Sequence, residues 1–405
     1  MNKLSYLEKL LDGVEVEWLT AAEIFNIKNG YTPSKAKKEF WEDGNIPWFR
    51  LEDIRTNGRE LNDSIMHVNQ AGVKGNLFPK DSIFMSTTAT IGEFALVKIP
   101  HLTNQQITNF SLTSRFKGII DIRYLFHRFH HFGEWCKENA NKSGGLSIIG
   151  IKKLSSYKFP IPCPDNPEKS LAIQSEIVRI LDKFTALTAE LTAELTAELN
   201  MCKKQYNYYR DQLLSFKEDE VEGKRKTLGE IMKMRAGQHI SAHNIIERKE
   251  ESYIYPCFGG NGIRGYVKEK SHDGEHLLIG RQGALCGNVQ RMKGQFYATE
   301  HAVVVSVMPG INIDWAFHML TAMNLNQYAS KSAQPGLAVG KLQELKLFVP
   351  SIERQIYIAA ILDKFDTLTN SITEGLPREI ELRQKQYEYY RDLLFNFPKP
   401  ETVSN

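Results

Sequence analysis

Residues 180–188 read ILDKFTALT, and the motif returns 181 positions later as ILDKFDTLT at residues 361–369. Residues 204–216, KQYNYYRDQLLSF, return at the same offset as KQYEYYRDLLFNF. Self-similarity at a fixed offset indicates that one structural unit occurs twice. The middle and the end of the chain therefore contain two related long elements.

Both elements are predicted to be helical. Residues 171–216 show helical periodicity and contain no proline or glycine, which predicts a helix of roughly 65–70 Å. Residues 353–397 have the same pattern, but Gly375 and Pro377 interrupt it. We therefore expect a kink or a break in the second helix at this point.

The segments before the two helices are also related. KLSSYKFPIP (153–162) resembles KLQELKLFVP (341–350), and YLEKLLDGVEVEW (6–18) loosely echoes the residues at 210–224. These echoes predict a circular pseudo-two-fold symmetry with the chain ends near each other. The regions 14–162 and 222–350 contain most of the Gly and Pro residues together with short β-like runs, which predicts mixed α and β domains.

Charge is distributed unevenly along the 405 residues. The net charge is +3, but residues 14–162 carry +4 and residues 222–350 carry +5. The helical regions 163–221 and 351–405 carry −4 and −2. Basic domains on acidic supports suit the phosphate backbone of nucleic acid, although such modest charges also occur on ordinary domains.

Several classes of protein are disfavoured. The five cysteines form no C-x-x-C pair, which argues against a metal site or a disulfide framework and fits the reducing cytoplasm. No apolar run reaches the roughly 18–20 residues of a membrane span, and the N-terminus lacks the apolar stretch of a signal peptide. We expect a cytoplasmic protein that contacts no membrane.

The sequence contains no catalytic motif that we can assign. Phosphate-binding loops, H-E-x-x-H and G-x-S-x-G are absent. Phe258-Gly-Gly-Asn-Gly262 fits the F-x-G-x-G of methyltransferases, but residues 263–267 indicate a turn and a strand where such a loop needs a helix. We therefore expect no catalytic residues in this chain.

The repeats and the domains between them resemble the specificity subunit of type I restriction–modification enzymes. ILDKF, KQYxYYRD and the tandem TAEL units at 188–199 look like the type IC group. GYTPSKAKKEFWEDGNIPWFRLEDI (30–54) and FGGNGIRGYVKEKSHDGEHLLIGRQGALCGNV (258–289) look like parts of the family's recognition domains. The resemblance covers the whole chain.

This resemblance implies an α+β fold with two mixed α/β target-recognition domains, separated by two long helices that form an antiparallel coiled coil. It implies a noncatalytic subunit that reads double-stranded DNA, each domain recognising one half of a bipartite asymmetric site. Two modification subunits would bind it and methylate adenine, and restriction subunits would add cleavage. The cofactors S-adenosylmethionine, ATP and Mg would belong to those partners, with none bound by this chain.

The expected domain boundaries follow from the repeats. Residues 1–13 form an N-terminal part of the repeat and residues 14–162 the first recognition domain. Residues 163–221 form the central helical spacer, and residues 222–350 the second recognition domain. Residues 351–405 form the C-terminal helical spacer.

The tandem TAEL units indicate a spacer of adjustable length, with leucines at every fourth residue: Leu187, Leu191, Leu195 and Leu199. One unit adds about 6 Å of rise and about 40° of rotation to a helix. B-DNA advances about 3.4 Å and 34–36° per base pair. One unit would thus shift the two domains by roughly one base pair; the alternative is that these leucines only pack.

Two loops in each domain are predicted to contact DNA. An alignment at offset 195 places Ser86, Thr87 and Thr88 against the segment that begins with Arg281 and Gln282. Arginine bridges guanine O6 and N7, and glutamine pairs with adenine. The second loop supplies lysine for phosphate and small residues for close approach: Lys142, Ser143 and Gly144, matched by Lys331 and Gln334. The alternative is that both loops are turns needed for folding.

The repeated tyrosines suggest a surface for the modification subunits, made by Tyr206, Tyr209, Tyr387 and Tyr390. Packing at the helix ends explains them equally well. The main alternative for the whole chain is a coiled-coil scaffold or adaptor without sequence-specific DNA binding. A self-sufficient methyltransferase is the second alternative, which binding of S-adenosylmethionine to the isolated chain would reveal.

Overall fold

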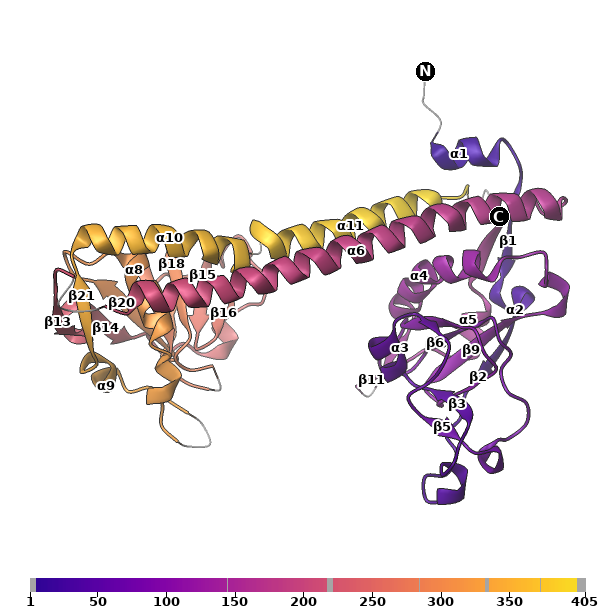
Figure 1. Ribbon diagram of the computed structural model, residues 1–405, viewed down its shortest axis with the longest axis horizontal. Coiled ribbons are helices and arrows are strands. Elements are labelled where there is room, and N and C mark those ends of the chain that lie inside the picture. The colour runs from indigo at the N-terminus through magenta and orange to yellow at the C-terminus, as the bar shows by residue number, and fades with distance from the viewer. Residues whose placement is uncertain are drawn as a thin grey trace. The chain divides into compact units, whose positions relative to one another are not determined.

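A computed structural model describes residues 5–143, 145–216, 221–283, 285–331, 335–371 and 373–398 (Figure 1). The chain folds as two compact units, and each is described by itself. Unit 1 comprises Met1–Leu191 and Arg383–Asn405, and unit 2 comprises Thr192–Leu382. Each unit therefore contains one globular domain and parts of the long helices.

The domain of unit 1 is built on a five-stranded sheet of order β2-β9-β6-β7-β4. A second sheet, β5-β3-β8, has three strands. The strands of these sheets are β2 (Phe25–Asn29), β3 (Ile46–Phe49), β4 (Glu60–Leu61), β5 (His67–Val68), β6 (Ser82–Ser86), β7 (Phe94–Val97), β8 (Leu102–Thr103) and β9 (Ile107–Leu112). The short helices of this unit are α1 (Tyr6–Leu11), α2 (Ala21–Ile24), α3 (Leu51–Asn57) and α5 (Ile151–Ser155).

Helix α4 (Ile122–Glu138) covers one face of the larger sheet and forms the core of unit 1. Asp121 caps its N-terminus by accepting a hydrogen bond from the backbone N–H of Arg123 at 2.8 Å. Its buried Phe129 meets Phe110 edge-to-face, with ring centroids 5.3 Å apart. Edge-to-face packing of this kind adds to the gain from burying aromatic surface.

The domain of unit 2 repeats this plan with different lengths. Its larger sheet has the order β14-β20-β17-β18, and its smaller sheet has the order β16-β15-β19. The strands are β14 (Met232–Ala236), β15 (Tyr255–Gly259), β16 (Gly262–Val267), β17 (Glu275–Gly280), β18 (Val289–Lys293), β19 (Tyr297–Ala298) and β20 (Ala302–Val307). Its helices are α7 (Leu228–Ile231), α8 (Ile313–Ala322), which buries Trp315, and α9 (Val339–Gln343). The hairpin β15–β16 confirms that the F-x-G-x-G segment precedes a strand.

Each domain begins and ends on one two-stranded ladder. In unit 1, β1 (Val16–Thr20) pairs antiparallel with β12 (Lys158–Pro162). In unit 2, β13 (Gly223–Thr227) pairs in the same way with β21 (Lys346–Pro350). The proline-marked segments that the sequence singled out are thus the strands by which each domain returns to a long helix.

The first long helix is continuous and the second is broken. Helix α6 runs over Pro167–Leu214, 48 residues, whereas the C-terminal region forms α10 (Ile352–Asn370) and α11 (Gly375–Leu394). Gly375 has φ +79°, and a Cβ there would lie 2.4 Å from the carbonyl oxygen of Thr367. The expected interruption is therefore a break, with Pro377 in the first turn of α11, where proline is tolerated.

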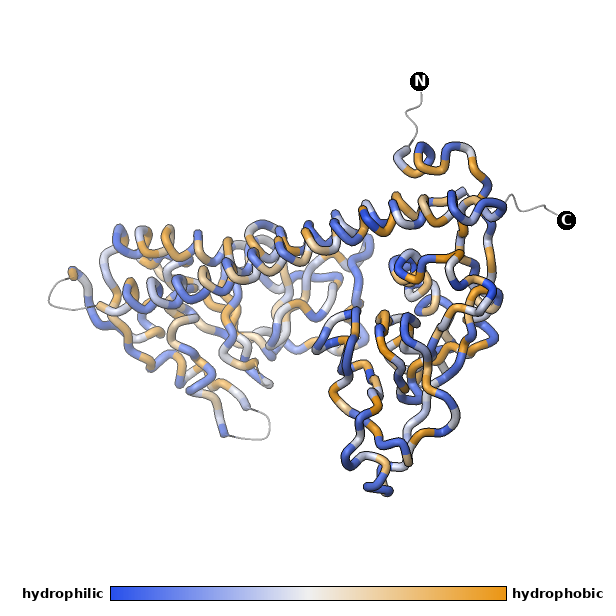
Figure 2. The backbone as a smooth tube through the Cα atoms, turned by 45° about the vertical axis from the view of Figure 1, so that its right-hand side comes forward, coloured by the Kyte–Doolittle hydropathy of each residue, from blue (hydrophilic) through white to orange (hydrophobic). Residues whose placement is uncertain are grey.

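The C-terminal helices pack on α6 within each unit. In unit 1, Phe184 stacks on Tyr390 with ring centroids 5.2 Å apart. In unit 2, Tyr209 stacks on Phe365 at 5.6 Å. Figure 2 shows apolar and polar positions alternating along these helices, as expected of helices with one packed face.

The TAEL leucines are only partly covered. Leu191, Leu195 and Leu199 are half-buried, whereas Leu187 is 50% exposed. Four residues rotate a helix by about 40° more than a full turn. Successive leucines of the repeat therefore move around the helix and cannot all face the same packing partner. The described helices include none that is both long enough and apolar enough to cross a membrane.

Candidate nucleic-acid interface

The two predicted loops of unit 1 lie side by side. The loop after β6 pairs with β11 (Leu146–Ile148), which forms a hairpin with β10 (Asn141–Ser143). Thr88 forms an isolated antiparallel β-bridge with Ile148, and the backbone N–H of Ala89 donates to the carbonyl oxygen of Ser147 at 2.8 Å. These backbone contacts join the loop after β6 to the segment that carries Lys142.

Unit 2 has the same arrangement. Gln282 forms an isolated antiparallel β-bridge with Gly336, and the backbone N–H of Gly283 donates to the carbonyl oxygen of Pro335 at 3.1 Å. The N–H of Leu337 donates to the carbonyl oxygen of Arg281 at 2.9 Å. Two segments that are far apart in the sequence therefore meet at one edge of each domain.

These hydrogen bonds correct the alignment of the two domains by one residue. Ser86 pairs with Ile107 across β6 and β9, and Gly280 pairs with Ala302 across β17 and β20. Thr87 and Thr88 are therefore the structural counterparts of Arg281 and Gln282. The two loops realign only at Gly92 and Gly287, so the loop of unit 2 is one residue longer.

The side chains of the unit 1 loop differ in how far they face solvent. Ser86 and Thr87 are buried, and the Thr87 hydroxyl lies 2.9 Å from the hydroxyl of Thr108. Thr88 is half-buried and Lys142 is exposed. Ser143 belongs to β10, and Gly144 lies outside the described residues.

The unit 2 loop presents longer polar side chains. Arg281 is half-buried, and its Nε donates to the carbonyl oxygen of Leu337 at 3.4 Å. Gln282 is exposed, with its Oε1 2.6 Å from Nδ1 of His301. Lys331 is exposed, whereas Gln334 lies outside the described residues.

Two further segments reach the same edge, and the sequence analysis missed them. In unit 1, the loop after β2 contacts the residues before β9, where the Thr32 hydroxyl donates to Oε1 of Gln105. In unit 2, Nδ1 of His239 lies 2.9 Å from Oε1 of Glu300 at the equivalent place. The shared spacing Gly-x-x-x-Ser at 30–34 and 237–241 was the available signal.

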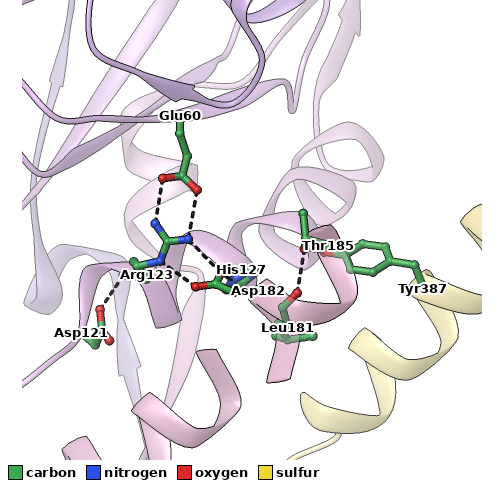
Figure 3. A network of polar contacts seen from close by, with 8 residues as sticks. All are labelled: Glu60, Asp121, Arg123, His127, Leu181, Asp182, Thr185 and Tyr387. Atoms are coloured by element: carbon green, nitrogen blue, oxygen red, sulfur yellow. Dashed lines mark hydrogen bonds and ion pairs between the residues drawn. The ribbon is translucent and has the colours of Figure 1, made fainter. Parts of the chain in front are cut away.

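The aspartate of each ILDKF repeat connects the globular domain to the long helix (Figure 3). In unit 1, Asp182 of α6 accepts hydrogen bonds from Nε2 of His127 at 2.8 Å and from Nη2 of Arg123 at 2.9 Å. Arg123 also donates to Glu60 at 2.8 Å. Burial alone would raise the pKa of Asp182, but hydrogen bonds from His127 and Arg123 outweigh it and lower this pKa to about 2.

Unit 2 repeats this contact with the second ILDKF aspartate. Nε2 of His318 in α8 lies 2.8 Å from Asp363 of α10, and Arg291 of β18 donates to the same carboxylate. Burial lowers the pKa of His318, although Asp363 partly opposes this effect. We call each of these two clusters an aspartate clamp. It fixes how the domain sits on its helix.

Comparison with known proteins decides the family. The model of the type I restriction modification DNA specificity domain matches residues 14–201 and 220–382. The type I restriction enzyme EcoprrI specificity subunit of Escherichia coli is 78% identical over 377 residues, which cover 92% of this chain and 93% of that protein. The chain belongs to the type I restriction–modification specificity subunit family.

Other relatives extend over the whole chain. The EcoR124I/EcoR124II specificity subunit of E. coli is 41% identical over 427 residues and covers 100% of both chains. A solved chain described under complex assembly of the type I R-M system superposes with a TM-score of 0.63 at 13% identity, covering 94% of this chain and 97% of its own. The S subunit from M. genitalium superposes with a TM-score of 0.50 at 16% identity, covering 96% and 98%. The predicted family and fold class are confirmed.

The tyrosines of this specificity subunit divide into buried and exposed members. Tyr206 and Tyr387 are 9% and 7% exposed and pack inside their units. Tyr209 and Tyr390 are 44% and 38% exposed, with one ring face covered by a phenylalanine. Among the four predicted partner-binding residues, Tyr209 and Tyr390 thus offer accessible surface.

Two neighbouring histidines of α4 also have charged partners. Arg59 lies 3.1 Å from Nδ1 of His130, and Nε2 of His131 lies 3.1 Å from Asp392. Burial lowers the pKa of both histidines, that of His131 to about 4. Within the described ranges, no group of three His, Cys, Asp or Glu side chains is placed to hold a metal ion.

Proposed function

We propose that this chain is the DNA-reading subunit of a type I restriction–modification complex, in which each globular domain reads one half of a bipartite asymmetric site. The observation that carries the proposal is the loop edge described above. Four segments meet there in unit 1, and the equivalent four meet in unit 2. The backbone plan is shared, whereas the side chains differ, as two different half-sites require.

The chemistry of the edge suits duplex DNA. Arg281 and Gln282 carry the donors and acceptors that distinguish base edges in the major groove. Lys142 and Lys331 are exposed at the neighbouring segments and suit phosphate contacts. Thr88 is the unit 1 counterpart of Gln282, and the buried Ser86 and Thr87 support the loop from within.

The helices serve a second role in this proposal. An antiparallel coiled coil of α6 with α10 and α11 sets the length of the nonspecific spacer, and the TAEL units adjust it. Two modification subunits bind the helical region through Tyr209 and Tyr390, and restriction subunits join them. S-adenosylmethionine, ATP and Mg act in those partners, and the complex works in the cytoplasm, where it reaches the chromosome.

A tagged chain expressed in its native host tests this function. We expect a modification subunit to copurify at about two copies per chain. We also expect adenine methylation at one bipartite motif to disappear from the genome when the gene is deleted. Unchanged methylation without such a partner would favour a coiled-coil scaffold that binds no specific sequence.

A further inference from the structure

Each domain holds an exposed glutamine at its loop edge, and in both cases a neighbouring side chain fixes the orientation of the amide. Resting on the proposed function, we propose that Gln105 and Gln282 each read an adenine in their own half-site. Thr32 and His301 act as positioning residues for these two amides. The two glutamines come from non-equivalent loops of their domains, and so do the two positioning residues. The arrangement that they share therefore does not follow from the sequence repeat.

In unit 1, Gln105 lies two residues before β9 and is exposed. The Thr32 hydroxyl donates a hydrogen bond to its Oε1. The backbone N–H of Gly30 fixes the Thr32 loop by donating to the carbonyl oxygen of Ile107 at 2.9 Å. A Cβ on Gly30 would lie 2.3 Å from the carbonyl oxygen of Thr103, so only glycine permits this close approach.

In unit 2, the equivalent position two residues before β20 is Glu300, and the glutamine comes from the loop after β17 instead. Nδ1 of His301 donates to Oε1 of Gln282 at 2.6 Å. Nε2 of His301 lies 3.5 Å from Oε1 of Glu300, which also contacts His239 at 2.9 Å. A His301 ring that donates through Nδ1 pairs with Glu300 through Nε2 only when both ring nitrogens carry protons, and in that form Glu300 helps to hold the ring in place.

Fixing the amide oxygen decides which base the glutamine accepts. A carbonyl oxygen has two lone pairs, and one is used by Thr32 or His301. The second lone pair and the amide N–H₂ remain, which together match N6–H and N7 of adenine in the major groove. A glutamine without such a neighbour turns its amide freely and discriminates less, because either end can face the base.

Site mapping with the complete complex tests the proposal. The chain is coexpressed with its modification subunit in a host without adenine methylation, and methylated motifs are mapped for each variant. Gln105→Ala should relax one A·T pair of one half-site by roughly tenfold to a hundredfold and leave the other half-site unchanged. Gln282→Ala should relax one A·T pair of the other half-site and leave the first half-site unchanged. Each variant is therefore the matched control of the other.

The positioning role has its own readout. Thr32→Val removes the donor with little change of shape and should relax the same A·T pair as Gln105→Ala. Thr32→Ser keeps a hydroxyl and should retain the wild-type motif. Glutamine variants that leave both half-sites intact, or relax both equally, would overturn the proposal. A wild-type complex that methylates no bipartite motif would instead overturn the proposed function.

Discussion

The aspartate clamp predicts a local loss of stability that can be estimated from the structure. In Asp182→Ala, the His127 side chain, 3% exposed, loses the acceptor for its Nε2–H. A buried donor left without a partner costs about 1–3 kcal/mol. The partly exposed Arg123–Asp182 pair adds at most about 1 kcal/mol, because Arg123 keeps Glu60 as a partner. We expect α4 to lose about 2–3 kcal/mol of protection against opening.

Hydrogen–deuterium exchange of the purified complex measures this loss. Peptides from α4 should exchange about 30- to 150-fold faster in Asp182→Ala, while peptides from α8 in unit 2 keep their wild-type rates. Asp363→Ala should accelerate exchange in α8 and leave α4 unchanged. Glu190→Ala, at an exposed position of α6, should change the exchange of neither helix. Unchanged exchange of α4, or equal acceleration in both units, would refute the role of the clamp.

The clamp also predicts a dependence on pH. The pKa of Asp182 is lowered to about 2, whereas an unfolded aspartate titrates near 3.9. The stabilisation is therefore fully present above about pH 4 and is lost as the pH falls toward 2. Because the Asp182 side chain is about one-third exposed, screening by solvent reduces this stabilisation to about 1 kcal/mol. In Asp182→Asn this acid-dependent part should be missing from an unfolding titration.

Three other outcomes follow from the helices. Deleting one TAEL unit, residues 192–195, should shorten the methylated motif's spacer by about one base pair, and an unchanged spacer would leave the leucines a packing role alone. Gly375→Ala forces a Cβ against the carbonyl oxygen of Thr367 and should cost more than about 1 kcal/mol in denaturant unfolding; no change would show that the break tolerates other residues. The double variant Tyr209→Ala, Tyr390→Ala should copurify with less modification subunit, and wild-type yield would argue for a helix-packing role.

The long helices could be predicted because their signals are local. Residues 171–216 combine helical periodicity with the absence of proline and glycine, and the observed helix spans Pro167–Leu214. Gly375 and Pro377 marked the interruption, since one favours positive φ and the other lacks a backbone donor. The two proline-marked segments singled out in the sequence form the strands β12 and β21.

The composition of the loop edge could be predicted only in part. The segments at 86–88 and 281–282 stood out because each follows a clear β-like run. Their register was wrong by one residue, because the matching glycines at 92 and 287 concealed an extra residue in the second loop. Sequence patterns show no such insertion until hydrogen bonds define the pairing.

Contacts over long sequence separations escaped the sequence analysis. Thr32 and Gln105 are 73 residues apart, and Asp182 and His127 are 55 apart. Neither pair belongs to a periodic pattern, so tertiary folding alone brings the side chains together. The repeat did contain one clue, because the same aspartate occurs in both copies of ILDKF.

Competition binding with the reconstituted complex tests the central claim most directly. The duplexes carry the methylated motif intact, with either half-site scrambled, or with its spacer lengthened by one base pair. We predict that each change weakens binding toward the nonspecific level, which lies at least about 10³-fold below specific binding at fixed salt. Equal affinity for all four duplexes would contradict the claim that the two domains each read one half of a bipartite site.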